Sequence, residues 1–236
     1  MNRRALVATL AAALAAPAIA HAAEPIQPRI VVTGEGEASV KPDLAVLTLS
    51  VMSEAETARE AMTANNTSMA GVIADMKASG IADRDLQTAG IQINPKYVYS
   101  NKPDGSQEAK LVGYQVTNTL TIRVRDIAKT GEVIDKAVSK GVNQGGMIAF
   151  TNDDPAATVT EARKKAVADA MAKAKTLSEA AGVTLGRIVE MSETNYAQPP
   201  MPIAAKAYAQ DSAGTAPVEA GENAYRVQVN VTFELK

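Results

Sequence analysis

The clearest pattern in this chain is the strict alternation of apolar and polar residues from position 225 to position 235. The apolar members fall on one face of an extended strand: Tyr225, Val227, Val229, Val231, Phe233 and Leu235. Residues 114–125 alternate similarly, with Asn118 as a polar interruption. Strands that are apolar on one face only are typical of antiparallel sheets with one face in water.

A helical period predicts two long helices, over about 54–79 and about 155–181. Methionines recur every seven residues in the first, at Met62, Met69 and Met76, which indicates a buried stripe rather than an oxidant trap or soft-metal site. Asp154 and Pro155 open the second helix as its N-cap and first residue. Its narrow apolar stripe comprises Ala162, Ala166, Ala170, Ala174, Leu177 and Ala181.

The elements repeat in the order strand, helix, strand, loop, strand. This weak internal duplication divides the chain into half-repeats of about 30–126 and 142–236, linked by a third helix over about 127–140. Further strands are expected over about 44–51, 89–94, 146–150 and 187–192. We predict an α+β fold in which an antiparallel sheet carries the core on one face and two long helices pack on it.

The amino terminus has the features of a secretory signal peptide over residues 1–22. Arg3 and Arg4 precede an apolar run, and small residues then fit cleavage after Ala20 or Ala22. We therefore expect export to the periplasm. No later stretch is long and apolar enough to span a bilayer, so we expect no integral membrane segment in the mature chain, while peripheral association with the envelope stays open.

The composition removes most familiar chemistry. The chain has one histidine, His21, and no cysteine, so neither a Ser-His or Cys-His nucleophile nor a His/Cys zinc, haem or iron–sulfur site is expected. Of 24 basic side chains, 22 remain once Arg3 and Arg4 are removed; against 26 acidic ones the net charge is −4. Nucleic-acid binding is therefore not expected. We predict no catalytic residue, cofactor or metal, and no enzymatic activity.

Three polar motifs have structural explanations. The stretch Gly34-Glu35-Gly36 lacks the third glycine and the following helix of a dinucleotide loop, so we predict a bend or bulge there. The acidic pairs Asp83 with Asp85 and Asp153 with Asp154 lack the further oxygen ligands that calcium needs. We expect these four carboxylates to cap helices and form turns.

Two long polar segments, 95–110 and 195–221, occupy the same place in each half-repeat, and we expect both to be loops. Loops of this length are usually functional or disordered, and the sequence leaves open a contact surface or an unstructured connection. Exposed Tyr, Met and Pro favour contact with a partner. The candidate assembly contacts are Tyr97, Tyr99, Tyr196, Pro200 and Met201.

Several stretches resemble the SIMPL-domain family. They include Val32-Thr-Gly-Glu-Gly, Val40-Lys-Pro-Asp-Leu-Ala, Gly80-Ile-Ala-Asp-Arg-Asp-Leu-Gln-Thr and Ala162-Arg-Lys-Lys-Ala-Val-Ala-Asp-Ala. The resemblance covers nearly the whole mature chain. It implies an α+β fold, a cell-envelope location and self-assembly, and it supplies no catalytic motif.

The leading hypothesis is a non-enzymatic periplasmic homo-oligomer with a role in envelope maintenance or stress protection. The alternative is a binding module for a small or polymeric envelope ligand, held in the cleft between the two halves. A glycan-cleaving enzyme would need two carboxyl groups facing each other across a cleft, and the sequence indicates no such pair.

Overall fold

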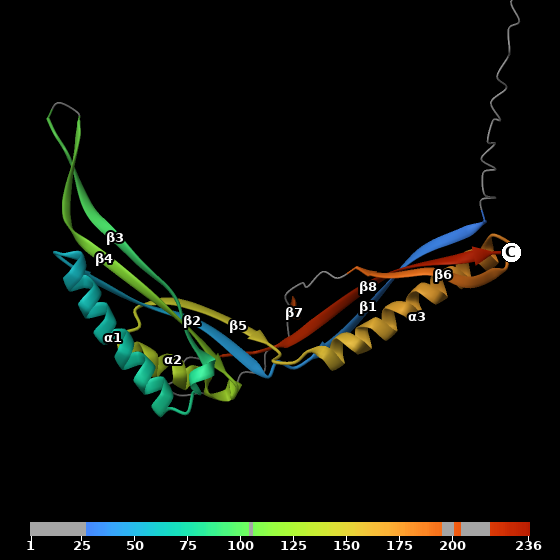
Figure 1. The fold of residues 1–236 in the computed structure, drawn as a ribbon, viewed down its shortest axis with the longest axis horizontal. Helices are drawn as coiled ribbons and strands as arrows, with labels where there is room; N and C mark the ends of the chain where they lie inside the picture. Colours follow the sequence, from blue (N-terminus) through green and yellow to red (C-terminus); the bar gives the residue numbers. More distant parts are fainter. Residues whose placement is uncertain (1–26, 104–105, 195–200, 204–217) are drawn as a thin grey trace, which may run out of the picture.

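The computed structural model describes residues 27–103, 106–194, 201–203 and 218–236. Over these residues the chain forms two four-stranded antiparallel sheets, each with one long helix packed on it (Figure 1). The predicted α+β class, with antiparallel strands and two long helices, is therefore confirmed. The sequence indicated one sheet, whereas the structure divides the strands between two lobes at opposite ends of an elongated molecule (Figure 1).

We call the first lobe the hairpin lobe. Its sheet has the strand order β3-β4-β2-β5, and helices α1 and α2 share one core with it. Its elements are β2 (Leu44–Ala55), α1 (Ala58–Ala78), β3 (Leu86–Asn101), β4 (Gln107–Val124), α2 (Thr130–Ser139) and β5 (Gln144–Thr151), with 3-10 turns at Asp83–Asp85 and Ile127–Lys129. The predicted helix over 127–140 is thus a 3-10 turn followed by a shorter α-helix.

Helix α1 begins later than the sequence indicated because a capping box closes its first turn. The Glu60 N–H donates to Thr57 Oγ1 at 3.2 Å, and the Thr57 N–H donates to the Glu60 carboxylate at 3.2 Å. Glu54, the predicted first residue, lies in β2. Met69 and Met76 are buried as predicted, and Met62 is half-buried.

We call the second lobe the α3 lobe. Its sheet has the order β1-β8-β6, and the short strand β7 also pairs with β8. Its elements are β1 (Arg29–Val40), α3 (Ala156–Ala180), β6 (Leu185–Thr194), β7 (Met201–Ile203) and β8 (Glu222–Leu235). Strand β8 buries the predicted face, including Val227, Val229, Val231 and Phe233.

The stripe of α3 follows every fourth residue from Ala162 to Ala174 and continues to Ser178. Leu177 and Ala181, which were predicted on this stripe, are exposed because neither lies on the row of residues spaced four apart. The helix starts at Ala156, one residue later than predicted, and Asp154 Oδ1 accepts a 3.0 Å hydrogen bond from the Ala156 N–H.

Gly34 and Gly36 lie in a continuous strand, so the predicted bend or bulge is wrong. Strand β1 pairs with β8 without a register shift. A Cβ added at Gly34 would overlap the carbonyl oxygen of Ala166, and one at Gly36 would overlap that of Ala162. The glycines therefore let the backbone of α3 approach β1 directly.

The first predicted loop, 95–110, is also wrong. Strand β3 runs on to Asn101 and β4 starts at Gln107, so this segment is a β-hairpin that projects from the lobe (Figure 1). Pro95 fits because β3 is an edge strand, where a missing N–H costs no ladder bond. In the second predicted loop, 195–221, Met201 begins β7, whereas Tyr196 and Pro200 lie outside the described residues. The predicted signal peptide, residues 1–22, also lies outside them.

The two lobes exchange strands with respect to the predicted half-repeats of 30–126 and 142–236. Strand β1 pairs with β8, and β5 pairs with β2, so each range contributes a strand to the other lobe's sheet. The half-repeats remain a prediction about the sequence. Among the described helices, none has the length and apolar character that crossing a membrane requires.

Candidate functional site

The projecting part of the β3–β4 hairpin is a ribbon of only two strands. Strand β2 ends at Ala55, which pairs with Tyr114 of β4. Beyond this pair, residues 96–101 of β3 lie against residues 107–113 of β4, and a register shift leaves Val112 as an extra residue. We call this segment the ribbon. A two-stranded ribbon is marginally stable in water unless another surface covers it.

One face of the ribbon is apolar. Tyr97 pairs with Leu111 and Tyr99 with Ala109, and side chains of directly paired residues point to the same face of the sheet. Tyr97 is 46% exposed, Tyr99 65% and Leu111 44%. We call this surface the ribbon face. The structure thus places the predicted contacts Tyr97 and Tyr99 side by side on one surface.

The opposite face of the ribbon is more polar. Val98 pairs with Lys110, and Ser100 with Glu108. Lys102 and Glu108 form an ion pair of 3.2 Å there. The ribbon is therefore amphipathic, although Val98 is itself 53% exposed.

The ribbon face continues the side of the sheet that α1 covers. Ile91 and Ile93 precede Tyr97 on β3 at the two-residue spacing of one strand face, and they pair with Asn118 and Val116, which are buried. The helix starts only after β2 has ended, and the ribbon extends past it (Figure 1). The apolar surface of the lobe is thus left uncovered where it reaches the ribbon.

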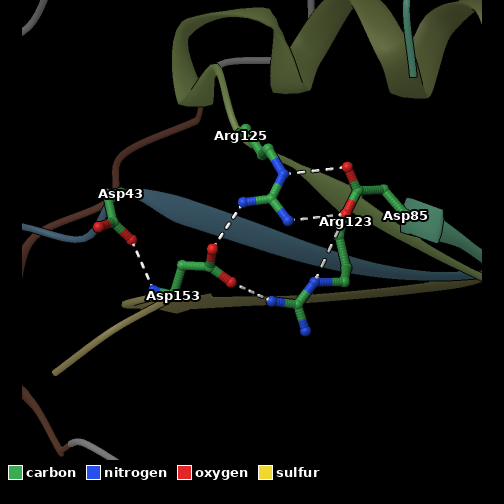
Figure 2. Close-up of polar contacts among 5 residues, drawn as sticks. All are labelled: Asp43, Asp85, Arg123, Arg125 and Asp153. Carbon is green, nitrogen blue, oxygen red and sulfur yellow. Dashed lines mark hydrogen bonds and ion pairs between the residues drawn. The ribbon is translucent and has the colours of Figure 1, made fainter. Parts of the chain in front are cut away.

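A cluster of Asp and Arg side chains lies at the end of the hairpin lobe that faces the α3 lobe. Figure 2 shows how Asp85, from the turn before β3, and Asp153, which follows β5, meet two arginines at the end of β4. Arg125 donates two hydrogen bonds of 3.0 Å to Asp85 and one of 2.6 Å to Asp153. Arg123 donates one of 2.5 Å to Asp153. Asp43 accepts a 2.8 Å bond from the Asp153 N–H.

These carboxylates are fixed charges. Hydrogen bonds from Arg125 hold the pKa of Asp85 below its ordinary value, and burial opposes them only in part. The pKa of Asp153 is lowered too, chiefly by its hydrogen bond from Arg125. A general acid or base needs a pKa near the working pH, so at neutral pH these two groups suit an ion-pair network rather than proton transfer.

We call the cluster of Asp43, Asp85, Arg123, Arg125 and Asp153 the Asp–Arg network. It corrects the expectation that Asp83, Asp85, Asp153 and Asp154 all serve as caps and turns. Asp85 and Asp153 hold arginines, and Asp83 forms an ion pair of 3.1 Å with Lys77. Asp154 was predicted as the N-cap of α3, but Pro155 is the N-cap; Asp154 lies one residue earlier, where its carboxylate accepts the hydrogen bond from the Ala156 N–H. Within the described residues no cluster of three or more His, Cys, Asp or Glu side chains could hold a metal ion.

Asn152 continues the polar arrangement into the α3 lobe. Its Nδ2 donates to the carbonyl of Lys41 at 2.8 Å. Its Oδ1 accepts hydrogen bonds of 3.0 Å from Asn223 Nδ2 and from the Tyr225 hydroxyl, both in β8. Asn223 is 1% exposed and also donates to the carbonyl of Phe150 at 3.2 Å. Partial burial raises the pKa of the Tyr225 hydroxyl.

A hollow of about 360 Å³ lies on the α3 lobe. It is lined by Glu35, Gly36, Glu37, Thr194, Arg226, Val227 and Gln228, from β1, β6 and β8. Arg226 Nε donates to Glu37 at 2.6 Å, and Gln228 Nε2 donates to Glu35 at 2.9 Å. The ligand site predicted from the sequence was the cleft between the halves, whereas this hollow belongs to one lobe.

Sequence comparison places these features in a known family. The family model described as "SIMPL: Protein of unknown function (DUF541)" matches residues 30–233. The chain belongs to the SIMPL family. The resemblance found in the sequence is therefore confirmed, and the ribbon and the Asp–Arg network lie within the matched residues.

Two relatives show how the family is named. The 26 kDa periplasmic immunogenic protein of Brucella melitensis is 52% identical over 212 residues, covering 88% of this chain and 85% of that protein. The uncharacterized protein YggE of Escherichia coli K12 is 28% identical over 214 residues, covering 90% of this chain and 85% of that protein.

Proposed function

We propose that this protein is a non-enzymatic periplasmic protein of the cell envelope that works as a homo-oligomer assembled through the ribbon face. The observation that carries the proposal is the pair Tyr97 and Tyr99, exposed with Leu111 on a two-stranded ribbon. The name of the Brucella relative supports the periplasmic location. Envelope maintenance or stress protection is the role we assign to the assembly.

A second copy is the occupant that the ribbon face fits best. Tyr side chains combine a large apolar body with a hydroxyl, which makes them frequent anchors of interfaces between proteins. The β3 edge beside them is free in the described sheet, so its backbone groups can also pair with another chain. Tyr196, Pro200 and Met201 remain candidate contacts in the same proposal.

The absence of enzymatic activity is part of the proposal. Two of the carboxylates that the sequence singled out, Asp85 and Asp153, bond arginines and have lowered pKa values. The hollow on the α3 lobe holds Glu37 already paired with Arg226. Both arrangements favour structural or binding roles over proton transfer.

Light scattering on purified residues 23–236 tests the proposal. The double variant Tyr97→Ser/Tyr99→Ser is compared with Val98→Ser, which alters an equally exposed residue on the other face of the ribbon. Burying one large apolar side chain contributes about 1.5–3 kcal/mol, so the double variant should weaken association at least about a hundredfold. An unaltered protein that stays monomeric at high concentration contradicts the proposal.

A binding module is the second candidate, favoured by the hollow on the α3 lobe. Its carboxylates, guanidinium and amide suit a hydroxyl-rich ligand such as a short glycan. Calorimetry with soluble fragments of envelope glycans would detect binding, and Gln228→Ala should weaken it. Absence of binding to every fragment would remove this candidate.

A further inference from the structure

The two lobes have separate hydrophobic cores. One core cluster draws its members from β2, β4, α1, α2 and Val142 in the turn after α2, and the other from β1, β8 and α3; within the described residues the clusters share no member. Bodies joined without a large apolar interface are expected to move relative to one another. Their relative orientation therefore depends on the connections and polar contacts between them.

The chain crosses between the lobes at two places in the described structure. Residues 41–43 join β1 to β2, and residues 152–155 join β5 to α3 (Figure 1). Pro42 restricts the first crossing and Pro155 the second, because proline fixes its own φ. Two short, stiff crossings restrict the distance between the lobes and leave a rotation to be fixed by contacts.

Asn152 and Asp153 supply such contacts. Asn152 bonds the first crossing through Lys41 and bonds β8 through Asn223 and Tyr225. The neighbouring Asp153 bonds Arg123 and Arg125 of the hairpin lobe and, through its N–H, Asp43. Two consecutive residues thus connect both crossings and both lobes.

We propose that Asn152 and Asp153 form an interlobe clip that fixes the angle between the hairpin lobe and the α3 lobe. The second step of the inference rests on the proposed function: by fixing this angle, the clip sets the direction in which each copy presents its ribbon face to the next. The clip is a positioning device, since neither residue lies on the ribbon.

Loss of the Asn152 side chain should loosen the contact between the lobes without unfolding them, with the hydrogen bond from Asn223 to Phe150 left as a direct link between β8 and β5. The Asn223 amide keeps its bond to Phe150 but loses Asn152, and the Tyr225 hydroxyl and the Lys41 carbonyl lose this partner. Neither core cluster contains Asn152, so each lobe keeps its apolar contacts. The rotation between the lobes is the property expected to change.

Distance measurement between two spin labels tests the clip. The natural chain has no cysteine, so Asn66→Cys on α1 and Lys164→Cys on α3 would carry labels on exposed helix positions, one in each lobe. The measurement uses the Tyr97→Ser/Tyr99→Ser background to keep distances within one copy. Asn152→Ala should broaden the distance distribution at least about twofold.

Asn143→Ala is the matched control. Asn143 also makes two side-chain hydrogen bonds of 2.8 Å to backbone, with the N–H and carbonyl of Met52, but both lie inside the hairpin lobe. The spin-label distance distribution of Asn143→Ala should match that of the unaltered protein. If Asn152→Ala fails to fold, Tyr225→Phe removes the hydroxyl that donates to Asn152 Oδ1. The distance distribution of this variant should broaden as well. A folded Asn152→Ala or Tyr225→Phe with an unchanged width overturns the clip.

The assembly step has its own outcome. In the natural ribbon background, Asn152→Ala should change the mass or broaden the size distribution of the oligomer in light scattering. A broadened spin-label distance with an unchanged oligomer overturns the link between clip and assembly and leaves the proposed function standing. A monomeric parent protein overturns the proposed function and this link together, and leaves the angle measurement to decide the clip alone.

Discussion

Arg125 holds the buried carboxylate of Asp85 with two hydrogen bonds of 3.0 Å, from Nε to Oδ2 and from Nη2 to Oδ1. Asp85 is 4% exposed, whereas the Arg125 side chain is 43% exposed. The buried acid therefore depends on a partner at the surface, and the pair ties the turn before β3 to the end of β4.

Asp85→Asn should destabilise the protein. The substitution keeps the shape of the side chain but removes its charge and turns one acceptor into a donor that faces the guanidinium. Hydrogen bonds to charged groups contribute about 1.5–3 kcal/mol, so we expect a loss of about 2 kcal/mol in the free energy of unfolding. Urea denaturation measures it. Asp83→Asn, at an exposed ion pair, should cost under about 0.5 kcal/mol; equal losses in both variants would refute the role of burial.

Stability should fall in acid. Asp85 and Asp153 have pKa values in the folded state below the ordinary value, so the unfolded chain binds protons more readily. Their stabilising contribution is present above the unfolded pKa of about 3.9 and is lost as the pH falls through the folded pKa. The urea midpoint should therefore decrease below about pH 4, less steeply in Asp85→Asn. The same acid dependence in both proteins would contradict this assignment.

Gly34→Ala should disturb the packing of α3 on β1. Its new Cβ would overlap the Ala166 carbonyl, and backbone cannot move aside as a flexible side chain can. Overpacking of this kind costs about 1–3 kcal/mol. Gly71→Ala is the control: nothing lies within 4 Å of the new Cβ on α1, and alanine there should stabilise the helix by about 0.5–1 kcal/mol. Thermal denaturation of the two variants should shift in opposite directions.

Elements with a strong local period could be predicted from the sequence. The seven-residue methionine spacing located α1, and the alternation in 225–235 located β8 within a few residues. The ribbon was missed because Pro95, Lys96 and the polar tip have the composition of a loop. The two-residue spacing of Ile91, Ile93, Tyr97 and Tyr99 continued across Pro95 and was the signal that could have located the strand.

Long-range relationships could not be predicted in the same way. Arg29 pairs with Glu234 across nearly the whole chain, and no local pattern encodes that choice of partner. The Asp–Arg network likewise gathers Asp43, Asp85, Arg125 and Asp153 from four separate segments. Tyr97 and Tyr99 were predicted as contacts because they were expected to be exposed in a loop. In the structure they share one face of β3 because they are two residues apart in a strand.

Amide hydrogen exchange of the ribbon as a function of protein concentration tests the central claim most directly. A two-stranded ribbon exposed to water opens readily, so its amides exchange fast unless another surface covers it. We predict that the amides of residues 96–101 and 107–113 become strongly protected at high concentration and lose that protection on dilution, while β8 in the α3 lobe stays protected throughout. Fast exchange in the ribbon at every concentration would contradict assembly through this face.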